Sequence, residues 1–267
     1  MLKDITLGQY YQTDSIIHRL DPRVKLATTL AFIISLFVFD NVAGYAIAAI
    51  FLVIVIKLSK VPFKFMVKGM KAIVFLILLT VICNLLLTPG EPLVTLWKLT
   101  ITKEGLRIAA LMTVRLSFLI IGSSIMTLTT TPNQLTDAME KMMSPLKKIK
   151  VPVHEIAMMM SIALRFIPIL LEETDKIMKA QIARGADFES GNLITRAKNL
   201  VPLLVPLFIS AFRRANDLAM AMEARCYRGG EGRTKMKPLQ YKKRDYLAYG
   251  MLVLYLILIV AEKLVLE

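Results

Sequence analysis

The chain has few residues that could build a metal or redox site. Its 267 residues include two histidines and two cysteines, with Cys83 in an apolar run and Cys226 in a basic stretch. The cysteines form no CxxC pair and no disulfide framework. His154-Glu155 resembles the start of the HExxH zinc motif, but Met158 stands where the second histidine is required. We therefore predict no metal site and no catalytic residue.

Sequence patterns for nucleotide or lipid chemistry are missing as well. No GxxxxGK pattern occurs, so we do not expect this chain to bind ATP through a phosphate loop. The segment 183–187 weakly resembles a motif of membrane alcohol phosphatidyltransferases, but the further spaced aspartates of those sites are absent. A membrane-embedded lipid-modifying enzyme is therefore only a weak alternative.

Acidic residues are scarce relative to basic ones. The sequence has 34 Lys and Arg against 20 Asp and Glu, a net charge of +14. In a membrane protein such an excess is typical of cytoplasmic loops that face anionic lipid. Nucleic-acid binding is disfavoured, because the basic residues are interleaved with Met, Leu and Ile rather than gathered in a polar arm.

Long apolar runs are abundant. The chain is 56% hydrophobic, and its mean hydropathy is +0.59. These values indicate an integral membrane protein. We predict an all-α membrane fold with about five spans, at residues 22–39, 42–56, 72–87, 106–127 and 246–261.

The first span has a clear start. Asp21 suits an N-cap, and Pro22 suits the first helical position. We expect Arg23 and Lys25 to extend toward the membrane interface. Asp40-Asn41 then interrupts the apolar residues, which favours a two-helix hairpin over one bent helix.

The orientation follows from the basic residues. Residues 57–71 hold five lysines and no acid, so we place them in the cytoplasm. The N-terminus is then cytoplasmic and the C-terminus external, and residues 1–21 are not typical of a cleavable signal peptide. Arg115, near the middle of the fourth span, implies a protein or water neighbour.

The sequence changes character over residues 130–244. This stretch is basic and rich in Met and Leu without a clean span of about 20 apolar residues. We predict three parts: membrane helices in 1–129, a cytoplasmic domain in 130–244 and a last membrane helix in 245–267. The cytoplasmic part should contain two long helices, 154–184 and 199–225, with Pro202 and Pro206 near the start of the second.

These two helices end in nearly the same sequence. Ala183-Arg184-Gly185 ends the first and Ala224-Arg225-Cys226 the second. The helix dipole favours a cation in a last turn, which accounts for each arginine alone. Their recurrence indicates docking of two similar partners. Small residues spaced by three, Ala180 with Ala183 and Ala221 with Ala224, predict a close crossing of the helices.

Several segments along the chain form an ordered set of motifs. They are Asp21-Pro22-Arg23-Val24-Lys25, Leu164-Arg165-Phe166-Ile167-Pro168, Glu172-Glu173, Ala180-Gln181-Ile182-Ala183-Arg184-Gly185, and Ala221-Met222-Glu223-Ala224-Arg225 before Tyr227. Through this set the chain resembles, over essentially its whole length, the T component, the transmembrane coupling subunit, of energy-coupling-factor importers.

The resemblance implies a specific role. In that family the two Ala-Arg-Gly motifs end crossed cytoplasmic coupling helices and dock into grooves of two ABC-type ATPases. Those ATPases bind ATP and Mg, so this chain needs no cofactor of its own. A separate membrane S component binds the vitamin or other micronutrient, and the whole complex lies in the plasma membrane.

Two points stay open at this stage. Cys226 stands where the family has glycine, which leaves the backbone ending of the second helix undecided. A stand-alone secondary carrier is the main alternative function. Such a carrier needs polar midplane residues on broken helices, for which Arg115 is the one strong candidate.

Overall fold

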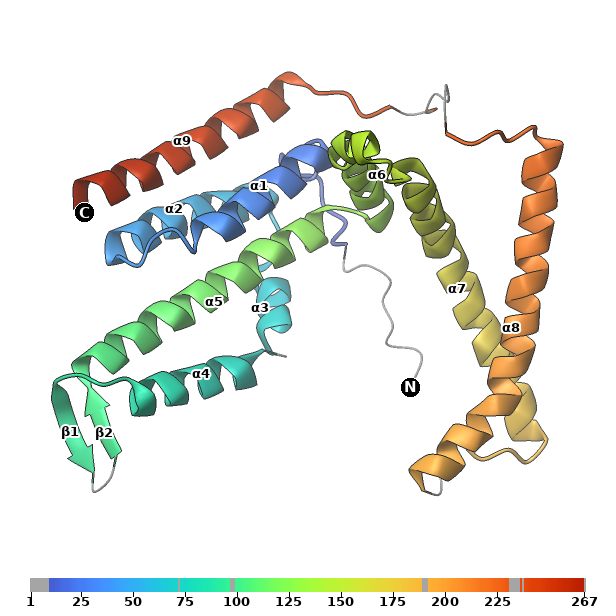
Figure 1. Cartoon of the computed structure of the whole chain (residues 1–267), viewed down its shortest axis with the longest axis horizontal. Coiled ribbons are helices and arrows are strands. Elements are labelled where there is room, and N and C mark those ends of the chain that lie inside the picture. The colour runs from blue at the N-terminus through green and yellow to red at the C-terminus, as the bar shows by residue number, and fades with distance from the viewer. Residues whose placement is uncertain are drawn as a thin grey trace. The chain divides into compact units, whose positions relative to one another are not determined.

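The computed structural model describes residues 10–71, 73–96, 99–188, 192–230, 236 and 238–266. Apart from one short β-hairpin, these residues form helices joined by turns and loops, which confirms the predicted helical fold (Figure 1). The chain divides into two compact units. We call Gly8–Ala138 with Leu239–Glu267 the bundle unit, and Met139–Pro238 the paired-helix unit.

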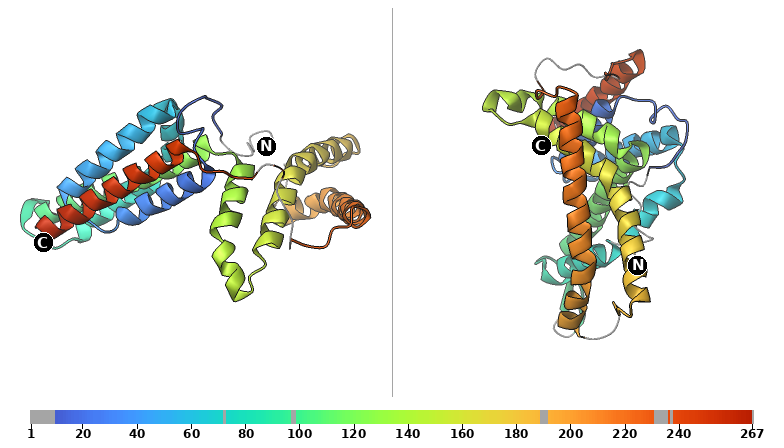
Figure 2. Two further views of the ribbon diagram at one scale, coloured as in Figure 1. Left: turned by 90° about the horizontal axis from the view of Figure 1, so that it is seen from above. Right: turned by 90° about the vertical axis from the view of Figure 1, so that its right-hand side faces the viewer.

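The bundle unit is built around four helices. They are α1 (Pro22–Ser35), α2 (Val42–Ser59), α5 (Lys103–Thr129) and α9 (Lys243–Leu266). Both α5 and α9 contact α1 and α2, and the helices run alongside one another in the left view of Figure 2. Their common core includes Phe32, Leu52, Ile125 and Tyr255, each buried. Burial of these side chains against one another holds the four helices together.

The chain reverses between α1 and α2, as the hairpin prediction requires. Val24, at the start of α1, and Val55 and Leu58, near the end of α2, line one cavity, so the two helices are antiparallel. The reversal is fixed by Arg115 of α5, which is buried. Its guanidinium donates to the carbonyl of Phe39 at 3.1 Å and pairs with Asp40 at 2.5 Å. The protein neighbour that Arg115 was expected to need is thus this turn.

One helix and one β-hairpin of the bundle unit were not predicted. Within the lysine-rich residues 57–71, α3 (Phe63–Lys71) forms and buries Met66. After α4 (Val74–Leu87), strands β1 (Pro92–Leu96) and β2 (Leu99–Thr102) pair antiparallel with an irregularity between Pro92 and Val94. Helices α3 and α4 and strand β2 all contact α5. The first residue of the third predicted span, Ala72, lies outside the described residues.

Several described helices are long and apolar enough to cross a membrane. They are α2, α5, α7 (Val153–Ala183) and Lys243–Val265 of α9, with a shorter apolar helix at Val74–Leu86. Helix α1 has 14 residues and is shorter than the span predicted at 22–39. By length and composition α7 also qualifies, although the sequence placed it in the cytoplasm. The count of five spans therefore stays a prediction.

The paired-helix unit consists mainly of α7 and α8 (Leu193–Ala224), preceded by a 3₁₀ helix at Ser144–Ile149. Helix α6 (Pro132–Met142) lies across the boundary between the two units. Helix α8 begins at Leu193, six residues before the predicted start at Asn199. Pro202 and Pro206 consequently lie inside the helix, and their expected place near its start was wrong.

A proline inside a helix leaves the carbonyl four residues earlier without its usual donor. For Pro206 that carbonyl belongs to Pro202, and Gln181 of α7 supplies a replacement. Its amide Nε2 donates to the Pro202 carbonyl at 3.4 Å. A contact between helices thus compensates for the proline, which explains why the helix can continue through it.

Candidate functional site

Helices α7 and α8 end in the same backbone motif. Beyond α7, the N–H of Gly185 donates to the Ile182 carbonyl at 2.9 Å, and the N–H of Ala186 donates to Gln181 at 3.0 Å. Beyond α8, the N–H of Cys226 donates to Glu223 at 2.8 Å, and that of Tyr227 donates to Met222 at 3.0 Å. Both patterns are Schellman motifs, in which the residue after the C-cap adopts a left-handed conformation. Arg184 and Arg225 are the two C-cap residues.

The residue after each arginine has the same conformation despite its different side chain. The φ angle is 88° at Gly185 and 55° at Cys226. A left-handed conformation costs a residue with a Cβ roughly 1 kcal/mol more than glycine. The ending of the second helix, left open by the sequence, therefore matches the first, with some strain at Cys226.

Exchanging these two residues should have opposite effects on stability. We expect Cys226→Gly to stabilise the end of α8, and Gly185→Cys to destabilise the end of α7, each by about 1 kcal/mol. A Cβ placed at Gly185 meets no atom within 4 Å, so the cost there is conformational rather than steric. Hydrogen exchange at the amides of Tyr227 and Ala186 measures the two ends separately. Changes of the same sign at both ends would contradict the interpretation.

The guanidinium groups of Arg184 and Arg225 are available to a partner. Both residues are exposed. Within the described part of the chain, neither side chain makes a hydrogen bond or an ion pair, in contrast to Arg214, which pairs with Glu173 at 2.8 Å. Ala183 and Ala224 beside them are exposed as well. Each helix therefore ends in an exposed arginine on a defined backbone motif.

The two ends lie far apart because α7 and α8 pack antiparallel. Glu173, near the middle of α7, accepts hydrogen bonds from Ser210 and Arg214 of α8. Arg225 follows Met222, which shares a pocket with Ile162 near the start of α7. From residue 162 to residue 184 the helix rises roughly 33 Å at about 1.5 Å per residue. The pair thus presents two similar arginine-bearing helix ends at opposite ends of its length.

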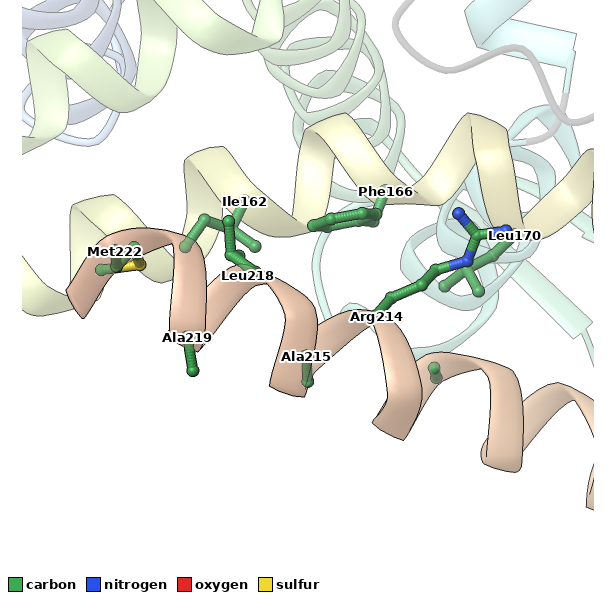
Figure 3. Close-up of a pocket in the computed structure, with 9 residues that line it drawn as sticks. Ile162, Phe166, Leu170, Arg214, Ala215, Leu218, Ala219 and Met222 are labelled. Carbon is green, nitrogen blue, oxygen red and sulfur yellow. The ribbon is translucent and has the colours of Figure 1, made fainter. Parts of the chain in front are cut away.

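A groove of about 320 Å³ separates the facing sides of the two helices. Ile162, Phe166 and Leu170 of α7 line it opposite Leu218 and Met222 of α8 (Figure 3). Beside it, the Glu173 cluster, which consists of Glu173, Ser210 and Arg214, joins the two helices by hydrogen bonds.

The alanines that were predicted to let the helices cross closely are not at this contact. Ala180, Ala183, Ala221 and Ala224 are all exposed. They occupy the last turns of their helices. The groove lies far from the end of α7, and in the last turn of α8 it is lined by Met222 rather than by Ala221 or Ala224. That part of the prediction was wrong, because spacing alone does not tell which face of a helix meets its neighbour.

The other residues of the predicted coupling motif are distributed along both helices. Arg165, Pro168 and Glu172 are exposed on α7, and Glu223 is exposed on α8. Of this set, Glu173 and Gln181 make hydrogen bonds between the two helices. The sequence analysis did not identify Ser210 and Arg214 as the partners of Glu173. They follow Glu173 by 37 and 41 residues, and no sequence pattern links residues so far apart.

The predicted interface motif at the start of α1 forms a separate cluster. Asp21 caps the helix by accepting from the N–H of Arg23 at 2.9 Å, and its carboxylate pairs with the Arg23 guanidinium at 2.8 Å. Pro22 takes the first helical position. Burial opposes the charged form of Asp21, but these bonds to Arg23 outweigh it and lower the Asp21 pKa. The guanidinium of Arg23 also lies 3.9 Å from the centre of the Tyr241 ring.

Lys25 does not extend toward an interface as expected. Its side chain is buried, and Nζ donates to the Thr129 carbonyl at 2.7 Å and to the His18 carbonyl at 3.2 Å. Sequence reasoning also missed Asp245, which accepts from the backbone N–H of Asp21 at 2.8 Å. An acid just inside the start of a helix is the one signal that could have drawn attention to Asp245.

Comparison with known proteins shows the family of this chain. A family model described as cobalt transport protein matches residues 13–236. Several curated relatives carry the name energy-coupling factor transporter transmembrane protein EcfT. The relative from Clostridium kluyveri is 59% identical over 250 residues, which are 93% of each chain. The one from Thermosediminibacter oceani is 54% identical over 248 residues, covering 93% of this chain and 94% of its own. The one from Bacillus subtilis is 48% identical over 246 residues, covering 92% and 93%. The chain therefore belongs to the EcfT family of energy-coupling factor transporter transmembrane proteins.

Proposed function

We propose that this chain couples two cytoplasmic ABC-type ATPases to a membrane S component that binds a vitamin or other micronutrient for ATP-driven uptake. The matched endings of α7 and α8 carry this proposal. A guanidinium offers planar donors suited to carboxylates and carbonyls in a partner groove. Arg184 and Arg225 present such donors from rigid helix ends roughly 33 Å apart along α7. ATP and Mg are assigned to the ATPases, and hydrolysis takes place there.

The length and charge of α7 support our proposal that α7 and α8 lie in the cytoplasm. The 31 residues of α7 extend for roughly 46 Å, which exceeds a hydrocarbon core of about 30 Å. Its last twelve residues, 172–183, include Glu172, Glu173, Asp175, Lys176 and Lys179. Charged side chains in lipid are costly. We therefore assign the apolar first half of α7 to contacts with α8 and with partner subunits rather than to contacts with lipid.

The contacts between α7 and α8 suit them to transmit force. The Glu173 cluster and the bond from Gln181 to the Pro202 carbonyl join the helices at separate points. A pair joined in this way can move as one body when attached ATPases close and open. Rigid-body rotation of packed elements is an established way to couple distant sites.

An exposed apolar stripe on α8 is the surface that we assign to the S component. It consists of Val201, Leu204, Val205, Phe208 and Phe212, spaced as one face of a helix. Phe208 and Phe212 are 62% and 68% exposed. Exposed aromatic side chains in such a row are typical of a contact surface.

Serine at Phe208 and Phe212 should therefore weaken binding of the S component. Burial of one phenylalanine contributes about 2 kcal/mol, so we expect at least a tenfold loss of affinity from the double substitution. The measurement is recovery of the S component and of the ATPases in pull-downs of the membrane-extracted complex. Leu264→Ser, at an exposed position of α9, is the control. Unchanged recovery of the S component, or equal loss of the ATPases, would contradict this assignment.

Co-purification and transport together test the proposed function. The tagged chain should be recovered from membranes with two ABC-type ATPases and an S component, and uptake should require ATP hydrolysis by those ATPases. If the chain instead purified alone and supported uptake unaided, it would be a secondary carrier and the proposal would be wrong. The bonds of Arg115 to the α1–α2 turn give that residue a structural role, which weakens the carrier alternative.

A further inference from the structure

The bundle unit contains a cavity of about 390 Å³ at the end where α1 and α9 begin and α2 and α5 end. Its walls are largely apolar and include Leu20, Val24, Phe51, Val55, Met126 and Met251. Four helices contribute to it, so its shape is set by the packing of the whole bundle. Lys25 and Arg244 are the two basic residues of its lining.

Lys25 is a buried cation that no carboxylate contacts directly, although Asp21 and Asp245 attract its charge from further away. Lys25 is only 6% exposed, and its ammonium group donates its two hydrogen bonds to backbone carbonyls, which carry no net charge. Across the described residues, no carboxylate forms an ion pair with Lys25. A buried charge without such a partner costs several kcal/mol. An anion at the mouth of the cavity would recover part of that cost.

The acidic groups at this end of the bundle are already engaged. Asp14 pairs with Arg19, and Asp21 pairs with Arg23. Asp245 accepts from the N–H groups of Asp21 and Lys242. The Arg244 guanidinium, by contrast, makes no hydrogen bond or ion pair within the described ranges.

We propose that this cavity binds an anionic phospholipid, with an acyl chain between the helices and the phosphate at Lys25 and Arg244. The apolar walls require a hydrocarbon occupant, and the two cations require an anion, so a lipid with a net negative headgroup satisfies both. The nearby lysines, among them Lys60, Lys242 and Lys243, are typical of a cytoplasmic leaflet boundary. Basic pockets between membrane helices on that side commonly hold acidic headgroups.

Native mass spectrometry of the full-length chain tests this site. The purified protein is titrated with phosphatidylglycerol and, separately, with phosphatidylcholine of the same acyl chains. We expect one phosphatidylglycerol to bind at least tenfold more tightly than phosphatidylcholine. Arg244→Gln should reduce that preference at least fivefold. Arg107→Gln, which removes an exposed arginine at the opposite end of α5, is the matched control and should leave the preference unchanged.

A second variant tests the cavity without changing any charge. Ala248 lines the same cavity, and Ala248→Phe should fill it and abolish the tightly bound lipid while the helical content by circular dichroism is kept. Equal affinity for the two lipids, or the same result for Arg244→Gln and Arg107→Gln, would overturn the proposal. Displacement of the lipid by millimolar inorganic phosphate would assign the cations to a small anion and would also overturn it.

Discussion

Alanine at Arg184 or at Arg225 is expected to weaken binding of the corresponding ATPase about thirtyfold, and the double substitution should abolish ATP-driven uptake. Truncating one member of a buried, charged hydrogen bond in an interface costs about 2 kcal/mol or more, and 1.4 kcal/mol is a factor of about ten. Both arginines are exposed C-cap residues without partners among the described residues. The chain should therefore fold normally, and the loss should appear only in assembly. Pull-down of each ATPase and uptake into proteoliposomes measure the two effects.

Matched variants separate docking geometry from charge. Lysine at either position keeps the charge but loses the planar fork of donors, so its effect should lie between those of arginine and alanine. Arg213→Ala removes an exposed arginine from the middle of α8 and should leave ATPase binding intact. Cys226→Gly relaxes the strained second ending while it keeps Arg225. If the double alanine variant still recovered both ATPases, the assignment of these residues would fail, whereas the family membership would stand.

The helix ends show how far local sequence can predict this structure. Arg184 followed by Gly185 predicts a C-cap arginine and a left-handed residue, and both are present. The same rule does not foresee the second ending, because Cys226 is not a residue that favours a positive φ. It adopts this angle while the N–H of Tyr227 bonds back to Met222. The hydrogen bonds of the Schellman motif, rather than a preference of cysteine for positive φ, hold this conformation.

Contacts between distant segments were beyond the reach of the sequence. The charge of Arg115 in an apolar run indicates that it needs a partner, but not that the partner is Asp40, 75 residues away. Lys25 resembles an interface residue by its position, yet it bonds to Thr129, 104 residues along the chain. A rule based on spacing along one helix cannot supply such pairs. They depend on which helices pack together, and only the structure shows that arrangement.

Alanine at Asp245 is expected to destabilise the bundle unit by about 3 kcal/mol. The Asp245 residue is 1% exposed, and its two carboxylate oxygens accept from the N–H of Asp21 at 2.8 Å and from the N–H of Lys242 at 2.7 Å. Removing it leaves two backbone donors without an acceptor, each at a cost of about 1–3 kcal/mol when buried. It also breaks the link between the starts of α1 and α9. Thermal unfolding of the purified protein in detergent measures the loss.

A second aspartate provides the control for this effect. Asp14 also pairs with a cation, Arg19, but both side chains are largely exposed, so Asp14→Ala should cost no more than about 0.5 kcal/mol. The loss of stability from Asp245→Asn should lie between the losses from Asp245→Ala and Asp14→Ala. The asparagine amide keeps one acceptor oxygen but turns an NH₂ group toward the second backbone N–H. Equal unfolding temperatures for Asp245→Ala and Asp14→Ala would show that the buried bonds contribute little. A clear difference would instead show that α1 and α9, whose bonded residues are 224 positions apart, depend on one carboxylate for their alignment.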